Sequence, residues 1–500
     1  MENISVESWV GMNQTKTPLF TRLYQHQQSS PYSFHVPGHK NGQVFLEAAK
    51  ATFERILTID QTEISGLDDL HGATGIIAEA QHLAADLYQV EATHFLVGGS
   101  TVGNIAMMMT VAERGETVLV QRNSHQSVFH GLELAGLRPV FLEPEWDDHL
   151  GLALGVARET LEYGVINYPE AKAVFLTHPS YEGYGQDLAR HVELVHQAGM
   201  MVCVDEAHGA HLIHDDGDAV WPRSSLKAGA DIVVQSAHKV LPAMTMASYI
   251  HINSQKVDKV KLRNYLRMLQ SSSPSYPLMA SLDVARAYLA SLTLSDWWQI
   301  TENISKFKNQ LVSGPGWKRS AQITGNYLQD PLKVAFATPY VGAAYEWQKR
   351  LEQEAVYPEL VSPQHLLLTL PLYNEAIDDK EWVPRLEKIL CLSEQQQCNF
   401  FKQPILQEQA NKLHATELVF SFEDMKQLAV QRQPWEKCEG FVGAETITPY
   451  PPGIPLILKG ERIRSTHLSK LKHLVQEGAF FQTGTNWIQQ GMTIFIDRGD

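Results

Sequence analysis

The middle of the chain alternates short apolar runs with segments of helical periodicity. Apolar runs of four to six residues, typical of strands buried on both faces, occur at 117–121, 139–142, 173–177, 200–205 and 231–235. Segments with apolar residues at helical spacing lie between several of these runs, as at 188–197. Such alternation predicts an α/β fold with a mostly parallel sheet covered on both faces. A further apolar run at 244–252 is predicted to turn back along the sheet.

Helical and mixed segments flank this region. Pro18–Gln28 and Ile76–Tyr88 are predicted as helices because their apolar residues share one face. After Gly314 the composition becomes mixed, which favours a smaller α+β domain, and the polar stretch 393–397 marks an internal boundary. We predict four parts: an N-terminal arm over 1–60, a large domain over 61–313, a small α+β domain over 314–395 and a C-terminal domain over 396–500.

The composition narrows the function. The 500 residues include 41 basic and 56 acidic side chains, which give a net charge of −15. That balance argues against nucleic-acid binding, which typically needs a basic surface. No run is as long as a membrane helix, the first residues do not resemble a signal peptide, and the four cysteines form no CxxC pair. We expect a cytoplasmic enzyme that acts on a small molecule.

Two apolar runs end in residues that can do chemistry. The first ends at Asp205, and the second is followed closely by Lys239. Because the carboxyl ends of parallel strands share one edge of a sheet, these side chains can lie close together. A protein that binds pyridoxal phosphate (PLP) needs at least two groups. One is a carboxylate that keeps the pyridine nitrogen protonated, and the other is a lysine that forms a Schiff base. The pair therefore predicts a large domain that binds PLP.

A glycine-rich turn and a histidine fit the same ligand. Gly98-Gly-Ser-Thr-Val-Gly103 lies where a strand leads into a helix, and free amide groups there can bind phosphate with help from Ser100 and Thr101. His125 opens a later helix and could stack on a flat cofactor, although a helix-cap or surface role is the simpler explanation of a lone histidine. Each signal is weak alone, whereas one PLP molecule accounts for all of them.

Two other interpretations of the same stretch are disfavoured. Asp205-Glu-Ala-His208 spells the DEAH box of helicases, but Asn104 stands where a phosphate-binding loop needs lysine. Four histidines suggest a metal, yet there is no HExxH motif and only one close His-x-x-His pair, so no metal site is predicted. These histidines are His208, His211, His214 and His238.

Several motifs together resemble the Orn/Lys/Arg decarboxylase family of fold-type I PLP enzymes, and most closely its short bacterial members without an N-terminal wing domain. The likeness extends from about Pro18 into the C-terminal domain. It rests on Phe34-His-Val-Pro-Gly-His-Lys-Asn-Gly42, Leu67-Asp-Asp-Leu-His71, Gly75-Ile-Ile-Ala-Glu-Ala-Gln81, the Ser-x-His-Lys at 236–239, Ser273-Pro-Ser-Tyr276, Ala280-Ser-Leu-Asp283 and Pro449-Tyr-Pro-Pro-Gly-Ile-Pro455.

The resemblance implies a role for each matching residue. Lys239 would form the Schiff base, Asp205 would bind the pyridine nitrogen and His125 would stack on the ring. His208 would lie beside the cofactor, where long members of the family usually have tryptophan. The phosphate would be held by Ser100, Thr101, Ser236 and His238. Ser272, in the loop 271–273, would reach the cofactor of a neighbouring subunit, so a homodimer with shared active sites is implied.

Three positions depart from the family pattern and bear on substrate preference. Gln126 replaces a lysine that commonly follows the stacking histidine, and Gly98-Gly99 stands where Asn-Gly or Gln-Gly is common. His178-Pro-Ser-Tyr-Glu182 replaces a commoner Asn-Pro-Thr-Tyr sequence.

The predicted reaction removes the α-carboxylate of lysine, arginine or ornithine and yields an amine for polyamine or diamine metabolism. The cationic end of such a substrate needs an acid, for which the candidates are Glu445, Glu461, Asp68 and Asp69. A solvated surface charge is the simpler explanation of any single one of them. The sequence does not distinguish the three substrates, and transamination, Cβ elimination or a regulatory PLP-binding paralogue remain alternatives.

Overall fold

The computed structural model divides into two compact units, which are described separately. The first unit comprises Met1–Val111, Met201–Asp215 and Arg223–Ser295, and the second comprises Ala112–Met200, Asp216–Pro222 and Asp296–Asp500. The structure describes residues 11–147, 152–213, 220–311, 313–314, 317–319, 326–337, 343–362, 365–375, 379–390, 414–450, 453–476, 478–482 and 484–496.

The predicted strands form the sheet region of each unit. In the first unit the strand order is β1-β10-β9-β8, and these strands are Ala92–Leu96, Ser248–Ile252, Ile232–Gln235 and Met201–Asp205. In the second unit the order is β6-β2-β3-β17, and these strands are Ala173–Thr177, Thr117–Gln121, Arg138–Leu142 and Ala415–Glu417.

The directions of these strands confirm the predicted fold class. The pairs β2–β3, β2–β6 and β8–β9 are parallel, and every residue of β2 and β9 is buried. β10 pairs antiparallel with β9, so the predicted strand over 244–252 does turn back, although it begins only at Ser248. β17 was not anticipated: it comes from the C-terminal part of the chain and extends the sheet antiparallel to β3.

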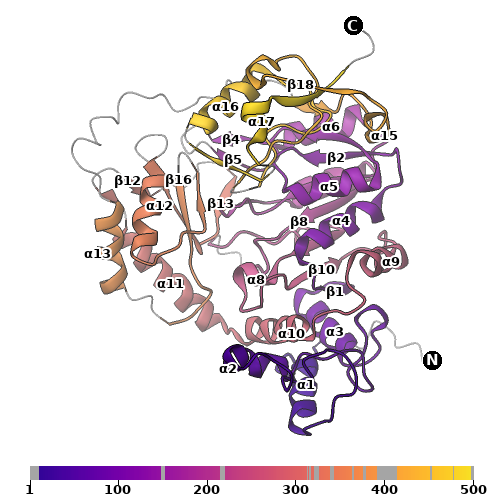
Figure 1. Ribbon diagram of the computed structural model, residues 1–500, viewed down its shortest axis with the longest axis vertical. Coiled ribbons are helices and arrows are strands. Elements are labelled where there is room, and N and C mark those ends of the chain that lie inside the picture. The colour runs from indigo at the N-terminus through magenta and orange to yellow at the C-terminus, as the bar shows by residue number, and fades with distance from the viewer. Residues whose placement is uncertain are drawn as a thin grey trace. The chain divides into compact units, whose positions relative to one another are not determined.

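Helices of the first unit cover its strands (Figure 1). α1 (Pro18–Gln28) and α3 (Ile76–Tyr88) have the predicted bounds, and α1 packs against α3 and α10 (Tyr276–Ser291). α4 (Gly99–Val111) packs against β10, β9 and α9 (Lys259–Leu269). Among the described residues, no helix is long and apolar enough to cross a membrane.

The second unit also contains the predicted smaller α+β region. A five-stranded antiparallel sheet has the order β11-β12-β14-β16-β15. In that order its strands are Ser313–Gly314, Trp317–Arg319, Lys333–Ala337, His365–Thr369 and Leu360–Val361. α12 (Ala343–Gln353) packs on β15 and β16 and also contacts α13 (Asp379–Leu390). The predicted boundary over 393–397 lies outside the described residues.

A separate apolar cluster organises the last part of the chain. Trp435, Ile447, Leu471, Phe481 and Trp487 are buried together, and the indole of Trp487 meets Phe481 edge-on with 5.2 Å between ring centroids. α16 (Ser465–Gln476) packs its apolar side chains into this cluster, and β18 (Val430–Gln433) pairs with β21 (Met492–Phe495).

A buried ion pair attaches α1 to α10 in the first unit. Arg286 Nη2 lies 2.8 Å from Asp283 Oδ1, and both side chains are fully buried. The other carboxylate oxygen of Asp283 accepts the backbone N–H groups of Leu19 and Phe20, at the start of α1. Arg286 also donates to the backbone carbonyls of Gln14 and Lys16. One pair therefore binds backbone N–H and carbonyl groups where the N-terminal segment meets the helix.

Asp283→Ala is expected to lower the free energy of unfolding by about 3–5 kcal/mol, because it leaves the Arg286 charge buried without its carboxylate. Denaturant unfolding would measure this loss. Glu162→Ala provides the control, since it removes a half-exposed ion pair with Arg158 on the second unit and should cost less than about 1 kcal/mol. Equal small losses in the two variants would contradict the structural role of the buried pair.

Candidate functional site

The register of two parallel strands brings the central candidates to one edge of the sheet. Asp205, the last residue of β8, pairs with Val234 of β9. Ser236 follows β9 as the N-cap residue of the short helix α8 (Ala237–Val240), which contains Lys239. Because both strands run the same way, the carboxylate and the lysine turn lie at their carboxyl ends, where α/β proteins bind ligands.

Lys239 contacts a buried histidine. Its Nζ lies 3.1 Å from Nε2 of His208, which is 5% exposed in the turn after β8. A lysine ammonium can donate to an unprotonated imidazole nitrogen, so His208 is placed to hold the lysine amine and to exchange a proton with it. The family resemblance implied only that His208 lies beside the cofactor; the structure adds its contact with Lys239.

Asp205 is held by a residue that the sequence analysis did not assign to the site. Asn104 Nδ2 donates to Asp205 Oδ2 at 2.8 Å, and the backbone N–H of Ala207 donates to Oδ1 at 3.1 Å. Both side chains are buried. These two donors fix the orientation of the buried carboxylate. The available signal was an amide side chain on the mostly apolar helix α4.

The start of α4 and the Ser236 hydroxyl together suit a phosphate. α4 begins at Gly99, whose positive φ of 74° favours glycine. In the first turn of the helix Ser100 is half-buried and Thr101 is exposed. Gly103 lets the helix approach the sheet, since a Cβ there would lie 2.7 Å from Leu96. The buried Ser236 Oγ has no hydrogen-bond partner within the described residues. These groups fit PLP, because they offer donors for its phosphate beside an amine and a carboxylate.

The other predicted cofactor residues of the first unit have local partners. His238 Nδ1 lies 3.1 Å from the carbonyl oxygen of Ala247, a contact that fixes the orientation of its ring. Ser272 is exposed, and the loop that carries it is held by His71, whose Nε2 lies 2.9 Å from the carbonyl oxygen of Ser271. The exposure of Ser272 is compatible with contact to a partner subunit.

His125 belongs to the second unit. It caps α5 (Gln126–Ala135), and its Nδ1 lies 2.9 Å from Ser127 Oγ and accepts the Ser127 backbone N–H. Helix capping, the simpler explanation of this residue, is therefore present. The cap also fixes the ring, and a ring fixed in this way can in addition stack on a cofactor.

The two acids in the loop before α3 hold the backbone. Asp68 accepts the backbone N–H groups of Thr74, Gly75 and Ile77 at 3.0, 2.9 and 2.9 Å. Burial raises the pKa of Asp68, but hydrogen bonds from backbone N–H groups, those of Thr74 and Gly75 foremost, outweigh it and the net pKa is lowered. Asp69 accepts the backbone N–H of His71. These bonds favour a structural function, and binding of a substrate cation by either acid stays a prediction.

The two C-terminal acids are also engaged within the second unit. Glu445 accepts the backbone N–H of Thr493 at 2.5 Å, which links it to β21. Glu461 is buried and forms an ion pair with Arg122 at 2.7 Å. Burial raises the pKa of Glu461, but the Arg122 charge outweighs it and the net pKa is lowered. Their proposed contact with substrate likewise stays a prediction.

A buried polar chain lies beside the Asp205 strand end. Glu206 accepts from Gln235 Nε2 at 2.7 Å, from the Ser225 backbone N–H at 2.7 Å and from Ser224 Oγ at 3.1 Å. The side-chain amide oxygen of Gln235, Oε1, in turn lies 3.1 Å from His251 Nε2. The Glu206–Gln235 bond therefore joins the ends of β8 and β9. The sequence analysis missed this link because two adjacent acids do not reveal which one faces the interior.

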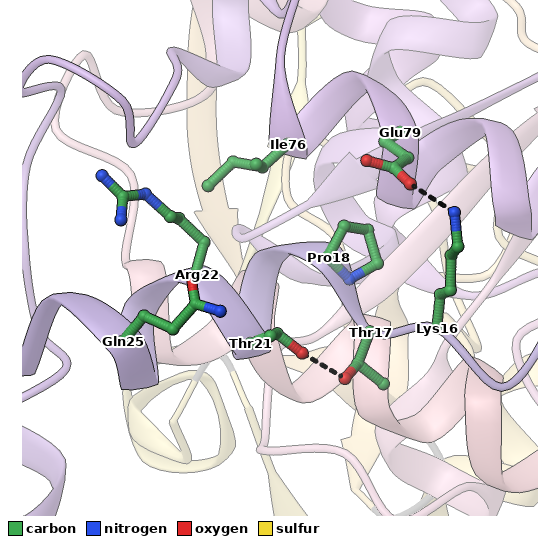
Figure 2. Close-up of a pocket in the computed structure, with 8 residues that line it drawn as sticks. All are labelled: Lys16, Thr17, Pro18, Thr21, Arg22, Gln25, Ile76 and Glu79. Carbon is green, nitrogen blue, oxygen red and sulfur yellow. Dashed lines mark hydrogen bonds and ion pairs between the residues drawn. The ribbon is translucent and has the colours of Figure 1, made fainter. Parts of the chain in front are cut away.

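Two other features contain no predicted site residue. An open pocket of about 340 Å³ lies between α1 and α3, where Lys16 pairs with Glu79 and Thr17 with Thr21 (Figure 2). Its lining is a surface of mixed charge. Among the described residues, no three His, Cys, Asp or Glu side chains are grouped to hold a metal ion, and His214 lies outside those residues.

Comparisons with known proteins identify relatives along nearly the whole chain. Residues 17–323 match the family described as "Orn/Lys/Arg decarboxylase, major domain", and residues 401–483 match its C-terminal domain. The chain is 39% identical to the uncharacterized protein YaaO of Bacillus subtilis, with 96% of this chain and 99% of YaaO covered. It is 32% identical to an arginine decarboxylase of the same organism, with 92% and 93% covered.

The solved structures agree on the fold. The constitutive lysine decarboxylase of Escherichia coli superposes with a TM-score of 0.76 over 96% of this chain and 82% of that chain, at 20% identity. A serine palmitoyltransferase of Sphingomonas wittichii, at 18% identity, gives a TM-score of 0.52 over 70% of this chain and 84% of its own. The fold is that of fold-type I PLP enzymes.

Glu206 should make stability depend on pH. Burial raises the pKa of Glu206 to about 7 from an ordinary value of 4.5, although its three donors act the other way. Between these values the unfolded chain loses the proton that the folded chain keeps, so the contribution of Glu206 to stability is greatest below about pH 4.5 and falls as the pH rises to about 7. At about 1.4 kcal/mol for each pH unit, the loss is about 3 kcal/mol.

Denaturant unfolding of the wild type and Glu206→Gln across pH 4.5–8 would measure this loss. The difference between the two free energies isolates Glu206 from other titrating groups, and it should change by about 3 kcal/mol over the range. A difference that is constant with pH would show that Glu206 is ionised in both the folded and unfolded chains.

Proposed function

The chain belongs to the Orn/Lys/Arg decarboxylase family, and from that premise we propose that it removes the α-carboxylate of arginine, lysine or ornithine. It is an amino-acid decarboxylase, and its cofactor is PLP. Arginine is the first substrate to consider, because the relative of known activity at 32% identity is an arginine decarboxylase, whereas a lysine decarboxylase of Pseudomonas aeruginosa is 24% identical. The single observation that carries the proposal is the contact of Lys239 with His208 at the strand edge that also holds Asp205.

PLP supplies an electron sink for the electron pair that is left when the Cα–carboxylate bond breaks. In our proposal Lys239 holds its aldehyde carbon, Asp205 its pyridine nitrogen and His125 one face of its ring. The phosphate is held by Ser100, Thr101, Ser236, His238 and, from the partner subunit of a dimer, the residue equivalent to Ser272. Asn104 is a positioning residue, because it keeps the Asp205 carboxylate oriented.

The residues of the chain account for the proton that the reaction needs. Loss of CO2 leaves the electron pair of the broken bond at Cα, and one proton must be added there to give the amine. Lys239 Nζ carries such a proton and contacts His208, which can restore it after transfer. The amine product would enter polyamine or diamine metabolism, in a cytoplasmic setting.

We also propose a homodimer with shared active sites. Tyr32, Phe34 and Leu46 are 88%, 95% and 74% exposed in the N-terminal part of the first unit. Three large apolar side chains exposed within fifteen residues of the chain support our proposal that another chain covers this surface. Light scattering of the purified protein should give twice the mass of the 56.1 kDa chain, and Phe34→Asp should shift it toward the monomer. A wild-type monomer at micromolar concentration would contradict the proposal.

The same four regions remain our proposal for the domain organisation: 1–60, 61–313, 314–395 and 396–500. The small antiparallel sheet and the separate C-terminal apolar cluster support the last two divisions. Limited proteolysis followed by mass spectrometry of the fragments would test the boundaries.

Product analysis tests the reaction and the substrate together. The purified protein with PLP should convert one of arginine, lysine or ornithine into agmatine, cadaverine or putrescine, as detected by mass spectrometry. Lys239→Ala should form no amine, because it lacks the group that holds the cofactor and carries the proton. Asn104→Ala should form the same amine at least tenfold more slowly, because Asp205 loses a buried donor.

Thr110→Val on the same helix provides the control for Asn104→Ala, since its buried hydroxyl donates only within α4 and the rate should change less than about twofold. If the wild type shows the visible absorbance of bound PLP but forms no amine, decarboxylation of these substrates is wrong. An oxo acid would then indicate transamination, and ammonia with pyruvate would indicate Cβ elimination.

A further inference from the structure

A buried arginine in the second unit binds one short C-terminal segment through several contacts. Arg122 directly follows β2, and its guanidinium donates to the carbonyl oxygens of Pro455 and Leu456 at 2.9 and 3.2 Å. It also pairs with Glu461 at 2.7 Å, and Glu461 accepts the backbone N–H of Leu458. The side chains of the pair are 11% and 5% exposed. The guanidinium therefore holds the segment 453–461 at Pro455 and Leu456 and, through Glu461, at Leu458.

Aromatic rings complete the site of the guanidinium. Its central carbon lies 5.9 Å from the ring centroid of Phe129, on α5, and 5.8 Å from that of Phe141, on β3. Rings at this distance attract a cation and exclude water. The planar guanidinium, with its directional donors, is thus held in one orientation, which a lysine ammonium would not reproduce.

The turn at Gly453 lies close to the ring of His125. Arg122 and His125 lie in the same loop, three residues apart, and Gly453 lies two residues before Pro455. A Cβ added to Gly453 would lie 3.8 Å from His125 Cδ2, and it would also contact the ring of Tyr450. With a positive φ of 88°, Gly453 lets the turn come this close to the histidine ring.

We infer that the Arg122–Glu461 pair positions His125. The pair holds the segment 453–461 against the loop 122–125. The turn at Gly453 then fixes the His125 ring that stacks on the cofactor. This inference rests on the proposed role of His125. Arg122 and Glu461 act through that ring and touch neither substrate nor PLP. The inference also gives Glu461 a function other than binding the cation of a substrate.

Attachment alone does not explain the pair. Lys459 Nζ already lies 2.8 Å from Glu133 Oε1 and links the same segment to α5 at the surface. A buried ion pair loses solvation and often stabilises a fold no better than an apolar pair of the same shape. The buried pair instead provides directed hydrogen bonds to two backbone carbonyls, which set the position of the segment.

The test compares PLP affinity with stability in matched variants. Arg122→Met combined with Glu461→Gln removes the clamp without leaving a single buried charge, so the apoprotein should melt within a few degrees of the wild type. Its Kd for PLP, from the absorbance of the bound cofactor, should rise about tenfold. The control, Lys459→Met with Glu133→Gln, removes the surface link between the same two segments and should change the Kd less than about twofold.

A comparison with His125→Ala shows whether the clamp acts through the ring. His125→Ala alone should also raise the Kd about tenfold, and adding it to the clamp variant should cause no further loss, because both changes remove one effect. A wild-type Kd in a folded clamp variant would overturn the inference alone. Independent losses that multiply to about a hundredfold would also overturn it. If His125→Ala leaves the Kd unchanged, the proposed role of His125 fails, and the inference fails with it.

Arg122→Lys provides a second test if the variant with Arg122→Met and Glu461→Gln does not fold. It keeps a positive charge beside Glu461 but loses the fork of donors to the two carbonyls. We expect its Kd for PLP to rise at least threefold, with the melting temperature of the apoprotein little changed. An unchanged Kd in this folded variant would likewise overturn the inference.

Discussion

The parallel pairing of β8 with β9 is the constraint on which the candidate site depends. β8 ends at Asp205, and β9 ends four residues before Lys239. Their pairing therefore places Asp205 beside the strand that leads to Lys239. Both strands are almost wholly buried, so a slip in their register would expose apolar side chains as well as separate these two groups. The packing of the core and the geometry of the chemistry are therefore fixed by the same hydrogen bonds.

Around this edge, buried polar groups are satisfied by one another. Asn104 binds the Asp205 carboxylate, and Glu206 binds Gln235, which contacts His251. A buried carboxylate without such donors would be costly, and with them it becomes an oriented group. Ser236 is different, because its buried hydroxyl has no partner among the described residues. That hydroxyl lies where the family resemblance places the phosphate of PLP, which would supply the partner.

Four acidic residues were predicted from their type to bind the cationic end of the substrate, and the structure shows what each of them contacts. Asp68 and Asp69 hold backbone N–H groups at the start of helices, Glu445 holds β21, and Glu461 holds Arg122. Nothing in the local sequence separates an acid that awaits a cationic substrate from one that already has a partner. The partners come from residues up to 339 positions away, so only the fold reveals them.

The sequence by itself determined the fold class, the family and the chemical type of the site, because these depend on apolar periodicity and on short motifs. α1 and α3 match their predicted bounds, since one buried face and local helix propensity suffice to define each. Only the tertiary structure decided that Asn104 orients Asp205, that Lys239 contacts His208 and that Arg122 takes Glu461 as its partner. It also decided that β17 pairs with β3, because a three-residue strand carries no periodic signal and forms only where an edge accepts it. Long-range pairing depends on the position of the whole backbone, which residue pattern alone does not contain.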